Sequence, residues 1–513
     1  TPTFGKWYYE VQSNVSGNNL VIGIAREDFN QDSTLVRFLD HDPLGYIYRA
    51  TDGYKSNNNS DSSYGDSYTA GDVVGVALDL DAGDLTFYKN GVSQGVAFSS
   101  LSGRYYFGLA IANGYEATAN FGQKPFKFPP PDGFQPLNAA NARPEDVITR
   151  PDNYVGVTTY YGSGGAKSIN VGMKPDLVWF KSTNAGNGHR LVDSVRGVGK
   201  ALVPQGTDSE KSESTGLTSF DRNGYSIGSA TDYNDSSSTT YVNWVWKAGG
   251  NKNDFNVDDE GFATAAAAGL TAGNVTPSGA SVGTKQGFSI IKFNSQSSDG
   301  NFTVPHGLNN TPNFILMKSQ TRNGGPWWIY HSSTTTAVDL YLSFTTAATT
   351  DNIDAGGGNV WGSALPTSTT FGFSTGTGTA HTQNETVMAY VWHDVPGLQK
   401  FGKYIGNNSA DGAFVELDFR PAVLWVKRTA GATANWYIMD KENQKLNPVI
   451  HALEPNTADS MNTGSVVNFD LLSNGFKIRG TDGDINADAT TYIYCAWAEA
   501  ASVDLFGGGA NAR

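Results

Sequence analysis

One short motif occurs three times in this chain of 513 residues: a proline, an unbroken run of apolar residues and then a lysine. Its copies lie at 174–182, 311–319 and 420–428. The apolar run is too short for a typical helix and is rich in β-branched and aromatic residues, so it predicts a strand that is buried on both faces. Proline fits the first position of such a strand, where its missing N–H group does least harm.

A second element recurs after each motif, in the form of an apolar segment that ends in tryptophan at 241–246, 387–392 and 492–497. The motif and this closing segment lie at similar separations in all three copies, which predicts one fold repeated three times. A site for specific aromatic stacking should not accept leucine in place of tryptophan, so we interpret the motif as core scaffold and expect recognition from the loops that differ between copies. The equivalent motif positions hold Trp179, Leu316 and Trp425.

The composition favours strands and turns over helices. Charged residues make up only 16% of the chain, there are 60 glycines, and Ser, Thr and Asn occur in every segment. A chain of this length should form several domains, each with its own core. We therefore predict an all-β, multidomain protein.

Charge and cysteine content exclude several classes of protein. The formal net charge of −14 and the absence of Lys/Arg clusters argue against nucleic-acid binding and against an anionic membrane surface. A single cysteine, Cys495, excludes an intrachain disulfide framework and a multi-cysteine metal site. No apolar run reaches the length of a bilayer span. We expect a soluble protein without membrane insertion.

The first 138 residues carry strand and hairpin patterns. Residues 3–11 alternate aromatic and polar side chains, residues 19–25 form an apolar run, and Asn90-Gly91 between apolar runs is a strong hairpin signal. Between them, residues 27–70 read as a long polar insertion that is rich in tyrosine, and a loop of that length in a compact domain is either disordered or functional.

These patterns resemble the SPRY domain, a concanavalin-like β-sandwich that serves as a recognition module. The resemblance rests on Gly-Lys-Trp-Tyr-Tyr-Glu at 5–10, Val-Ile-Gly-Ile at 21–24, the segments 71–76 and 87–91, and Tyr-Phe-Gly-Leu-Ala at 106–110. Family members usually begin with another strand or two before the first of these segments. We therefore expect upstream residues in a longer precursor.

The remaining chain divides around the repeats. We expect a linker with one short helix candidate at 262–270, and much of residues 145–513 resembles structural and tail-fibre proteins of marine and cyanobacterial tailed phages. The expected domains are a SPRY-like β-sandwich at 1–138, β-repeat 1 at 139–250, the linker at 251–283, β-repeat 2 at 284–397, β-repeat 3 at 398–500 and a Gly-rich tail at 501–513.

No pattern in the sequence points to catalysis. The seven histidines lack metal-ligand spacing, and no nucleophile elbow lies between a strand and a helix, so we expect no enzyme and no cofactor. Two suitably separated carboxylates would still suffice to hydrolyse a glycan. Asp79, Asp81 and Asp84 offer oxygen ligands for calcium but do not form an EF-hand loop, and turn roles are favoured for them.

Candidate ligand-binding residues are aromatic. Tyrosine in a loop on a rigid sandwich makes an adaptable recognition surface, with a merely solvated loop as the alternative. Trp327 and Trp328 are adjacent and must point to opposite faces if extended, so at least one of them is a candidate for exposure and for binding a sugar ring or a partner chain. The full set of predicted ligand-binding residues is Tyr46, Tyr48, Tyr54, Tyr64, Tyr115, Trp327 and Trp328.

The leading hypothesis is a non-enzymatic virion structural protein, a phage tail fibre or surface adhesin that recognises a host-surface glycan or protein, with the repeats forming a stalk or array. The second hypothesis is a self-assembling subunit of an extracellular filament or capsid decoration, and the third is a polysaccharide depolymerase. The first two imply a virion-surface or extracellular location, contacts with other virion or filament subunits, and a homo-oligomer.

Overall fold

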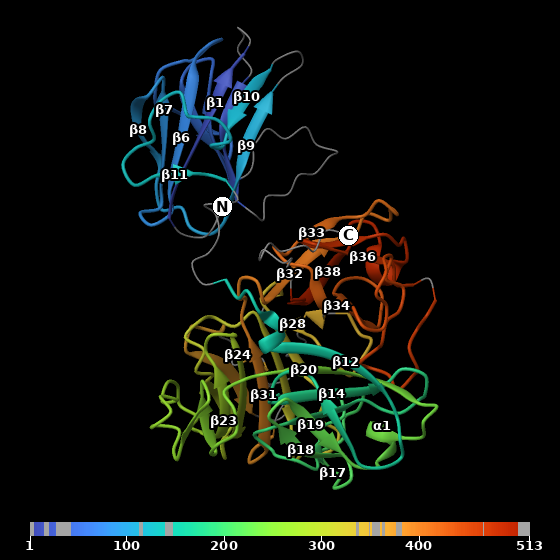
Figure 1. The fold of residues 1–513 in the computed structure, drawn as a ribbon. Coiled ribbons are helices and arrows are strands. Elements are labelled where there is room, and N and C mark those ends of the chain that lie inside the picture. Colours follow the sequence, from blue (N-terminus) through green and yellow to red (C-terminus); the bar gives the residue numbers. More distant parts are fainter. Residues whose placement is uncertain are drawn as a thin grey trace. The chain divides into compact units, whose positions relative to one another are not determined.

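The computed structural model describes residues 5–14, 20–26, 43–111, 116–138, 147–334, 338–347, 349–350, 360–361, 365–375, 382–464 and 466–500. The chain is nearly all β, as the sequence predicts. It divides into two compact units, Thr1–Asp146 and Val147–Arg513, each of which is described by itself (Figure 1).

The N-terminal unit is a sandwich of two antiparallel sheets. One sheet has the order β10-β1-β6-β7-β8, with β11 added parallel to β1, and the other has the order β5-β4-β3-β2-β9. Its strands are β1 (Lys6–Ser13), β2 (Leu20–Arg26), β3 (Gly45–Arg49), β4 (Tyr54–Asn57), β5 (Ser60–Ser63), β6 (Val73–Asp79), β7 (Asp84–Lys89), β8 (Val92–Phe98), β9 (Tyr105–Ile111), β10 (Ala117–Asn120) and β11 (Gln135–Pro136).

Alternate residues of the strands fill the core between these two sheets. On β1, Trp7, Tyr9 and Val11 point into this core, where they meet alternate residues of β2 and β6. Tyr8 and Glu10 lie on the opposite face of β1 and are nevertheless buried, at 1% and 3% exposure. Something must therefore cover the outer face of this sheet.

The segment that precedes β11 provides this cover. The Glu10 carboxylate accepts hydrogen bonds from the backbone N–H groups of Lys127 and Phe128, at 2.8 and 2.9 Å. The ring of Phe126 packs edge-on against Tyr8, with 5.0 Å between ring centroids. Glu10 thus ties the end of the unit to its first strand, more than a hundred residues earlier in the sequence.

Replacing Glu10 by alanine should release this segment. Two partly buried N–H groups would lose their charged acceptor, and a hydrogen bond to a charged group is worth about 1.5–3 kcal/mol. Hydrogen exchange should then show faster exchange over residues 126–137 and unchanged exchange in the C-terminal unit, whereas the exposed Glu116→Ala should change neither. Unchanged protection of 126–137 in Glu10→Ala would contradict this role.

In the C-terminal unit, the same four-strand order recurs three times. We name the strands of each repeat by chain order as opening, motif, outer and closing strands, and the spatial order is opening, closing, motif, outer. The three sets, in spatial order, are β12 (Val155–Tyr161), β20 (Thr240–Trp246), β14 (Leu177–Ser182) and β15 (Arg190–Asp193); β24 (Phe288–Asn294), β31 (Thr386–Trp392), β26 (Phe314–Ser319) and β27 (Trp328–His331); and β32 (Gln399–Ile405), β38 (Thr491–Ala498), β34 (Pro421–Arg428) and β35 (Trp436–Asp440).

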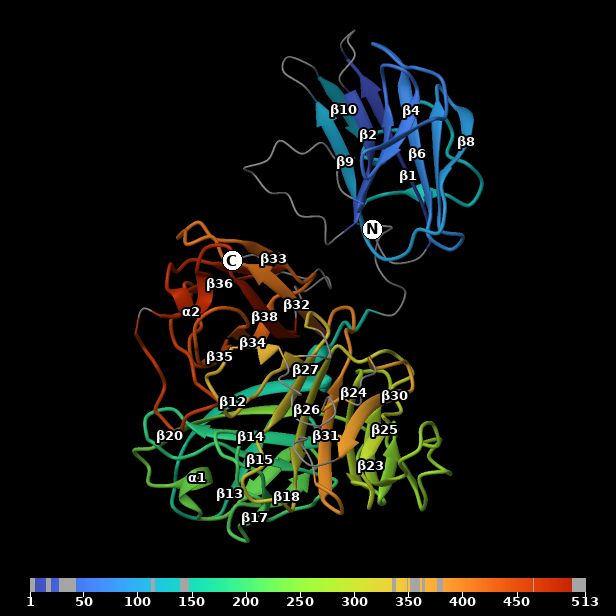
Figure 2. The ribbon, with the colours of Figure 1, turned by 180° about the vertical axis from the view of Figure 1, so that it is seen from behind.

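Each repeat adds a smaller second sheet, with the orders β13-β19-β18, β25-β30 and β33-β37-β36 (Figure 2). Their strands are β13 (Lys167–Asn170), β18 (Leu217–Asp221), β19 (Gly224–Ile227), β25 (Gly300–Pro305), β30 (Thr370–Thr375), β33 (Phe414–Glu416), β36 (Phe469–Leu472) and β37 (Gly475–Ile478). The remaining elements are η2 (Pro151–Asn153), α1 (Thr231–Asn234), α2 (Gly483–Asn486), β16 (Lys200–Ala201), β17 (Lys211–Ser212), β28 (Val338–Asp339) and β29 (Thr349–Thr350).

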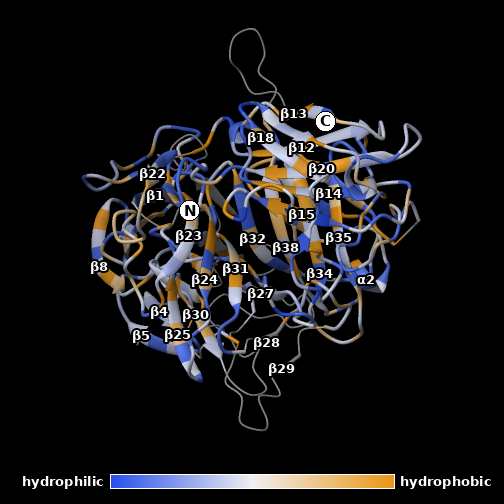
Figure 3. Cartoon of the chain, turned by 90° about the horizontal axis from the view of Figure 1, so that it is seen from below, coloured by the Kyte–Doolittle hydropathy of each residue, from blue (hydrophilic) through white to orange (hydrophobic). Residues whose placement is uncertain are grey.

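The motif strands are buried on both faces, as the sequence predicts, and the two faces belong to different cores. On β14, Val178 and Phe180 point into a core within repeat 1, while Leu177 and Trp179 point into a core that all three repeats share. The motif strands β26 and β34 divide their side chains in the same way. Figure 3 shows the hydrophobic residues concentrated on these central strands.

Three equivalent tryptophans lie at the centre of the shared core. The ring centroids of Trp246, Trp392 and Trp497, which end the three closing strands, are 5.4–6.2 Å apart in every pair. The expected stalk or array of separate sandwiches is therefore wrong for this unit. The repeats instead form a closed group of three around one core, because each large sheet has two apolar faces to bury.

The motif lysines connect the repeats in a cycle. Lys181 of repeat 1 donates to the carbonyl of Ala458 in repeat 3 at 3.2 Å, and Lys318 of repeat 2 donates to Thr207 of repeat 1 at 3.0 Å. Lys427 of repeat 3 donates to Thr345 of repeat 2 at 2.9 Å. All three side chains are fully buried. Head-to-tail contacts that close after three steps form a ring, here within one chain.

A second cycle of contacts uses one equivalent residue on each outer strand. Each of these residues contacts the repeat that the motif lysine of its own repeat does not contact. Asp193 accepts a hydrogen bond from the Tyr390 hydroxyl at 2.7 Å, and Asp440 accepts one from Trp244 Nε1 at 3.2 Å. At the equivalent position of repeat 2, His331 Nε2 lies 3.1 Å from the carbonyl oxygen of Tyr494. The two cycles fix the order and orientation of the three repeats.

The segment expected as a linker belongs to the second repeat. Residues 255–283 contain β21 (Phe255–Val257), β22 (Glu260–Phe262) and β23 (Pro277–Gly283), and β23 pairs with the opening strand β24. The helix expected at 262–270 does not form, and residues 265–269 are turns. Ala265 and Leu270 are buried in the core of repeat 2, so packing of the turn overrides the helix propensity of the alanines.

Candidate ligand-binding surface

The predicted tyrosines of the N-terminal unit lie mainly on strands. Tyr46 and Tyr48 are on β3 and Tyr54 begins β4, so the expectation of a long loop is wrong for residues 45–63, and part of the predicted insertion lies outside the described residues. Asn58 and Asn59 both adopt positive φ angles, which is typical of the tight type I′ turn that joins β4 to β5. Tyr115 also lies outside the described residues.

Tyr48 is a core residue and cannot contact a ligand. It is 0% exposed, its hydroxyl donates to the carbonyl of Asp66, and its ring packs on Tyr64, Tyr68 and Phe87. Burial raises the pKa of its hydroxyl. The prediction that Tyr48 is a ligand-binding residue is wrong, because the alternation of β3 points it between the two sheets.

Tyr54 belongs to a cluster of charged residues at the surface. The Arg49 guanidinium lies 5.7 Å from the ring centroid of Tyr54 and forms ion pairs with Asp52 at 2.8 Å and Asp61 at 2.9 Å. The hydrogen bond from Arg49 lowers the pKa of the Asp52 carboxyl. Tyr54 is 38% exposed, so its ring is held in place and still open to a partner.

On the other face of β4, Lys55 lies among aromatic rings. Its Nζ atom is 5.3 Å from the ring centroid of Phe98 and 5.8 Å from that of Tyr64, and it donates to the carbonyl of Ala97. Tyr46 packs against Phe98 with 5.2 Å between centroids. Because these four side chains are half-buried, they form an aromatic margin where β4 faces β8.

We define the β4 surface as Arg49, Asp52, Tyr54 and Asp61, which lie on the outer side. Of the predicted residues only Tyr54 belongs to it, since Tyr46 and Tyr64 lie on the other face of the sheet with Lys55 and Phe98. Arg49 and Lys55 were missed, although Gly-Tyr-Ile-Tyr-Arg at 45–49 alternates in a way that indicates a strand. That alternation places Arg49 and Tyr48 on opposite faces.

Trp327 and Trp328 are both buried, so the prediction that they are ligand-binding residues is wrong. Trp327 is in the shared core and its Nε1 donates to the carbonyl of Val203 at 2.9 Å, which is another contact from repeat 2 to repeat 1. Trp328 points into the core of repeat 2, where it packs on Tyr341. The two side chains do point to opposite faces, but both faces of this sheet are covered.

The three candidate calcium ligands have local roles. Asp79 pairs with Lys6 at 2.8 Å and accepts hydrogen bonds from the backbone N–H groups of Asp81 and Ala82 in the turn between β6 and β7. Asp81 accepts from the N–H of Gly5 at 2.8 Å, and Asp84 begins β7. Within the ranges the structure describes, no group of three or more His, Cys, Asp or Glu is arranged to hold a metal ion.

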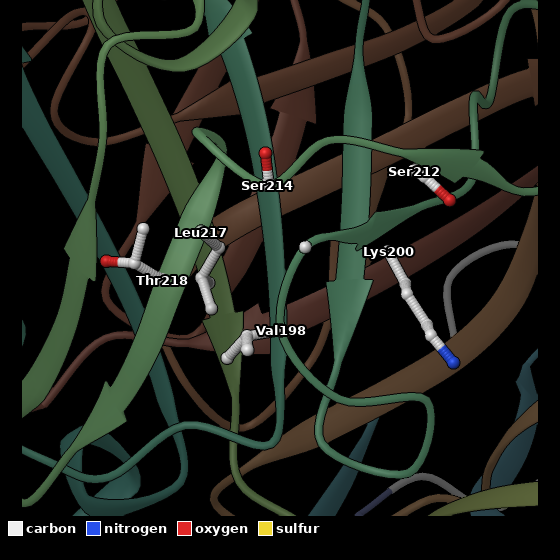
Figure 4. Close-up of a pocket in the computed structure, with 7 residues that line it drawn as sticks. Val198, Lys200, Ser212, Ser214, Leu217 and Thr218 are labelled. Atoms are coloured by element: carbon white, nitrogen blue, oxygen red, sulfur yellow. The ribbon is translucent and has the colours of Figure 1, made fainter.

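A hollow of about 310 Å³ opens beside β16, β17 and β18 of repeat 1 (Figure 4). Leu217 is buried at its base, while Val198, Lys200, Ser212, Ser214 and Thr218 are exposed around it. Since no buried polar side chain points into it, the hollow lacks the convergent polar groups of a built ligand site. None of the described helices is long and apolar enough to cross a membrane.

The fold defines a class: a two-part β protein with an N-terminal two-sheet sandwich and a closed C-terminal group of three repeats. Residues 150–501 match the family described as "Domain of unknown function (DUF7483)", and because this match covers more than half of the chain, the chain belongs to that family. Residues 6–124 match the SPRY domain, so the N-terminal unit is a SPRY domain.

Similar curated proteins share only the segment of the SPRY domain. The chain is 35% identical over 148 residues to an E3 ubiquitin-protein ligase RKP of Arabidopsis thaliana, which is 27% of this chain and 11% of the relative. It is 34% identical over 154 residues to the ATP-dependent RNA helicase DDX1 of Xenopus laevis, covering 29% of this chain and 19% of that protein.

A third relative, a Ran-binding proteins 9/10 homolog of Drosophila melanogaster, is 34% identical over 128 residues, which is 24% of this chain and 13% of that protein. The chain therefore spans less than a fifth of the length of each of these relatives. Among solved structures, the SPRY domain of human HERC1 matches with a TM-score of 0.21 and 18% identity, covering 24% of this chain and 79% of that structure.

Proposed function

We propose that this chain is a non-enzymatic binding protein whose SPRY domain recognises a partner through the β4 surface, while the C-terminal unit is a rigid scaffold. The observation that carries the proposal is the exposed, pre-positioned ring of Tyr54 beside Arg49, on a domain that recurs in otherwise unrelated proteins. Rigid aromatic and arginine side chains are the usual anchors of protein recognition.

The relatives support a role in binding a partner more than a catalytic role. Their printed names describe a ubiquitin ligase, a helicase and a Ran-binding protein, and what they share with this chain is the SPRY segment. A module common to proteins with such different activities is best explained as a binding domain. That this chain has no catalytic activity stays a prediction, and release of reducing sugar from a host polysaccharide would contradict it.

The setting we propose is the surface of a tailed-phage particle, where the partner is a host-surface glycan or protein. This step rests on the resemblance of residues 145–513 to structural proteins of marine and cyanobacterial phages. A closed scaffold suits that setting because its shared core makes it stable, and several copies on one particle would add avidity.

Binding to intact cyanobacterial cells tests the proposal. Fluorescently labelled full-length chain should bind host cells in flow cytometry, and Tyr54→Ala should weaken binding about tenfold or more, since truncating an anchor costs on the order of 2 kcal/mol. Leu446→Ala is the control, because Leu446 is also a large exposed side chain but lies in the third repeat of the C-terminal unit.

Equal binding by Tyr54→Ala and the unaltered chain would show that the β4 surface is not the recognition site. Absence of binding to any host strain that the phage infects would contradict the adhesin proposal itself. Tyr48→Ala is unsuitable as a test, because removing this core ring should unfold the SPRY domain whatever its role.

A further inference from the structure

The three opening strands have the same place in their repeats but different neighbours. In repeat 2, β23 pairs along the outer edge of β24 and buries its residues 288–291. In repeat 3, the turn before β32 occupies the start of that edge: Gln399 exchanges backbone hydrogen bonds with Val395, and Asp394 accepts from the N–H of Phe401. In repeat 1, β20 is the one strand of the described residues that pairs with β12.

The backbone of β12 presents unused hydrogen-bonding groups on its free edge. In an antiparallel strand, every second residue directs its N–H and C=O groups toward the neighbouring strand. The N–H of Lys247 donates to the carbonyl of Tyr154 and the N–H of Gly162 donates to the carbonyl of Thr239, so the even-numbered residues of β12 face β20. Residues 155, 157, 159 and 161 therefore direct their N–H and C=O groups away from β20. Within the described part of the chain, the groups of Val155, Val157 and Thr159 have no partner.

The side chains of β12 do not protect this edge. Its sequence, Val-Gly-Val-Thr-Thr-Tyr-Tyr, has no charge and no proline, which are the usual means of blocking strand addition. The equivalent strand β32 carries Lys400 and Lys403. Thr159 and Tyr161 are exposed, and residues 156–158 are half-buried where the equivalent residues 289–291 of β24 are fully buried.

We propose that the free edge of β12 pairs with β12 of a second copy of this chain. An antiparallel pair centred on Thr158 would join residue 157 to residue 159 of the other copy and would place residue 155 opposite residue 161. The Tyr161 carbonyl already accepts a hydrogen bond from Lys167 Nζ at 2.6 Å, so the new ladder uses mainly the groups of Val157 and Thr159 in both copies. The two four-stranded sheets become one sheet across a two-fold axis, the commonest symmetry of oligomers.

The uncharged sequence of β12 favours pairing with a second copy of this chain over pairing with a different partner. The pair brings uncharged residues opposite uncharged residues, and Thr158 lies opposite its own copy, a favourable cross-strand pair. The strand β23 shows that this edge of the repeat accepts an antiparallel strand of seven residues. The net charge of −14 on each copy opposes association, so the dimer should become stronger as salt screens that repulsion.

This inference does not depend on recognition by the SPRY domain. Its test is disulfide crosslinking of the full chain with Thr158→Cys, because a non-hydrogen-bonded antiparallel pair brings the two Cβ atoms close enough for a disulfide. The chain's own Cys495 is buried and should not react. Mild oxidation should convert most of the variant to a covalent dimer. Thr159→Cys should stay largely monomeric, because residue 159 lies opposite residue 157 of the other copy and its side chain points to the other face of the strand.

Sedimentation equilibrium of the unaltered chain provides the second measurement. A monomer–dimer equilibrium that strengthens with salt, and that Thr159→Pro abolishes by removing an outward-facing N–H group, is the expected result. A monomer at all soluble concentrations, or a dimer that crosslinks equally well through Thr159→Cys, would overturn the proposal. If Thr159→Pro fails to fold, the crosslinking result alone decides.

Discussion

Replacing Trp497 by alanine is expected to destabilise all three repeats of the C-terminal unit, although the residue belongs only to the third. Its ring packs against Trp246 of repeat 1 at 5.4 Å, Trp392 of repeat 2 at 6.1 Å and Trp425 of its own repeat at 5.5 Å. Truncation of a buried tryptophan removes this packing and leaves a cavity, which costs about 3–5 kcal/mol.

Urea denaturation measures the total loss, and hydrogen exchange shows where it falls. Protection should decrease together in the closing strands β20, β31 and β38, since the three repeats share one core. Leu446→Ala is the control, because Leu446 is 72% exposed and its loss should change stability by less than about 0.5 kcal/mol. If protection fell only in repeat 3, the repeats would be independent folding units.

Replacing Lys181 by methionine is expected to have an effect that depends on pH. The three N–H groups of the Lys181 ammonium share four backbone carbonyl oxygens at 2.9–3.3 Å, those of Ser182, Ala185, Asn187 and Ala458, and none of these partners is a carboxylate. Burial lowers the pKa of its ammonium group from 10.5 to about 8, and the same holds for Lys318 and Lys427.

The sign of the pH dependence follows from these values. Between about pH 8 and 10.5 the unfolded state binds more protons at Lys181 than the folded state, so this group adds stability as the pH rises. The unaltered chain should therefore gain up to about 3 kcal/mol of unfolding free energy relative to Lys181→Met between pH 7 and pH 10.5. Buried tyrosines titrate in both proteins and cancel in the difference.

Urea denaturation of both proteins at several pH values tests this expectation. Lys285→Met, which replaces an exposed lysine, should differ from the unaltered chain by a constant amount. A difference for Lys181→Met that is also independent of pH would mean that its ammonium group is as well solvated in the folded state as in the unfolded chain.

The strands of the repeats were largely predictable because their signal is local. A proline, a run of β-branched and aromatic residues and a closing tryptophan are enough to indicate a strand buried on both faces, and the structure places all three copies accordingly. The core role of Trp179, Leu316 and Trp425 followed from comparing copies, since leucine and tryptophan exchange readily only where apolar volume matters.

The candidate site was only partly predictable. A polar composition led to a loop prediction for residues 45–63, but cross-strand pairing with β2 turned this segment into β3–β5 and buried Tyr48. In the same way, the prediction that Trp327 and Trp328 point to opposite faces was correct, but both side chains are buried. Burial of a face depends on what packs against it, and that partner lies far away in the sequence.

The sequence by itself determined that this protein is all-β, that residues 6–124 lie in a SPRY domain and that one strand pattern recurs three times. Only the tertiary structure decided that the repeats close around a shared core. The motif lysines illustrate the reason: in the sequence they look like strand ends, yet each donates to a carbonyl of another repeat. Contacts between distant segments leave no local pattern, and they decide which faces stay open for binding.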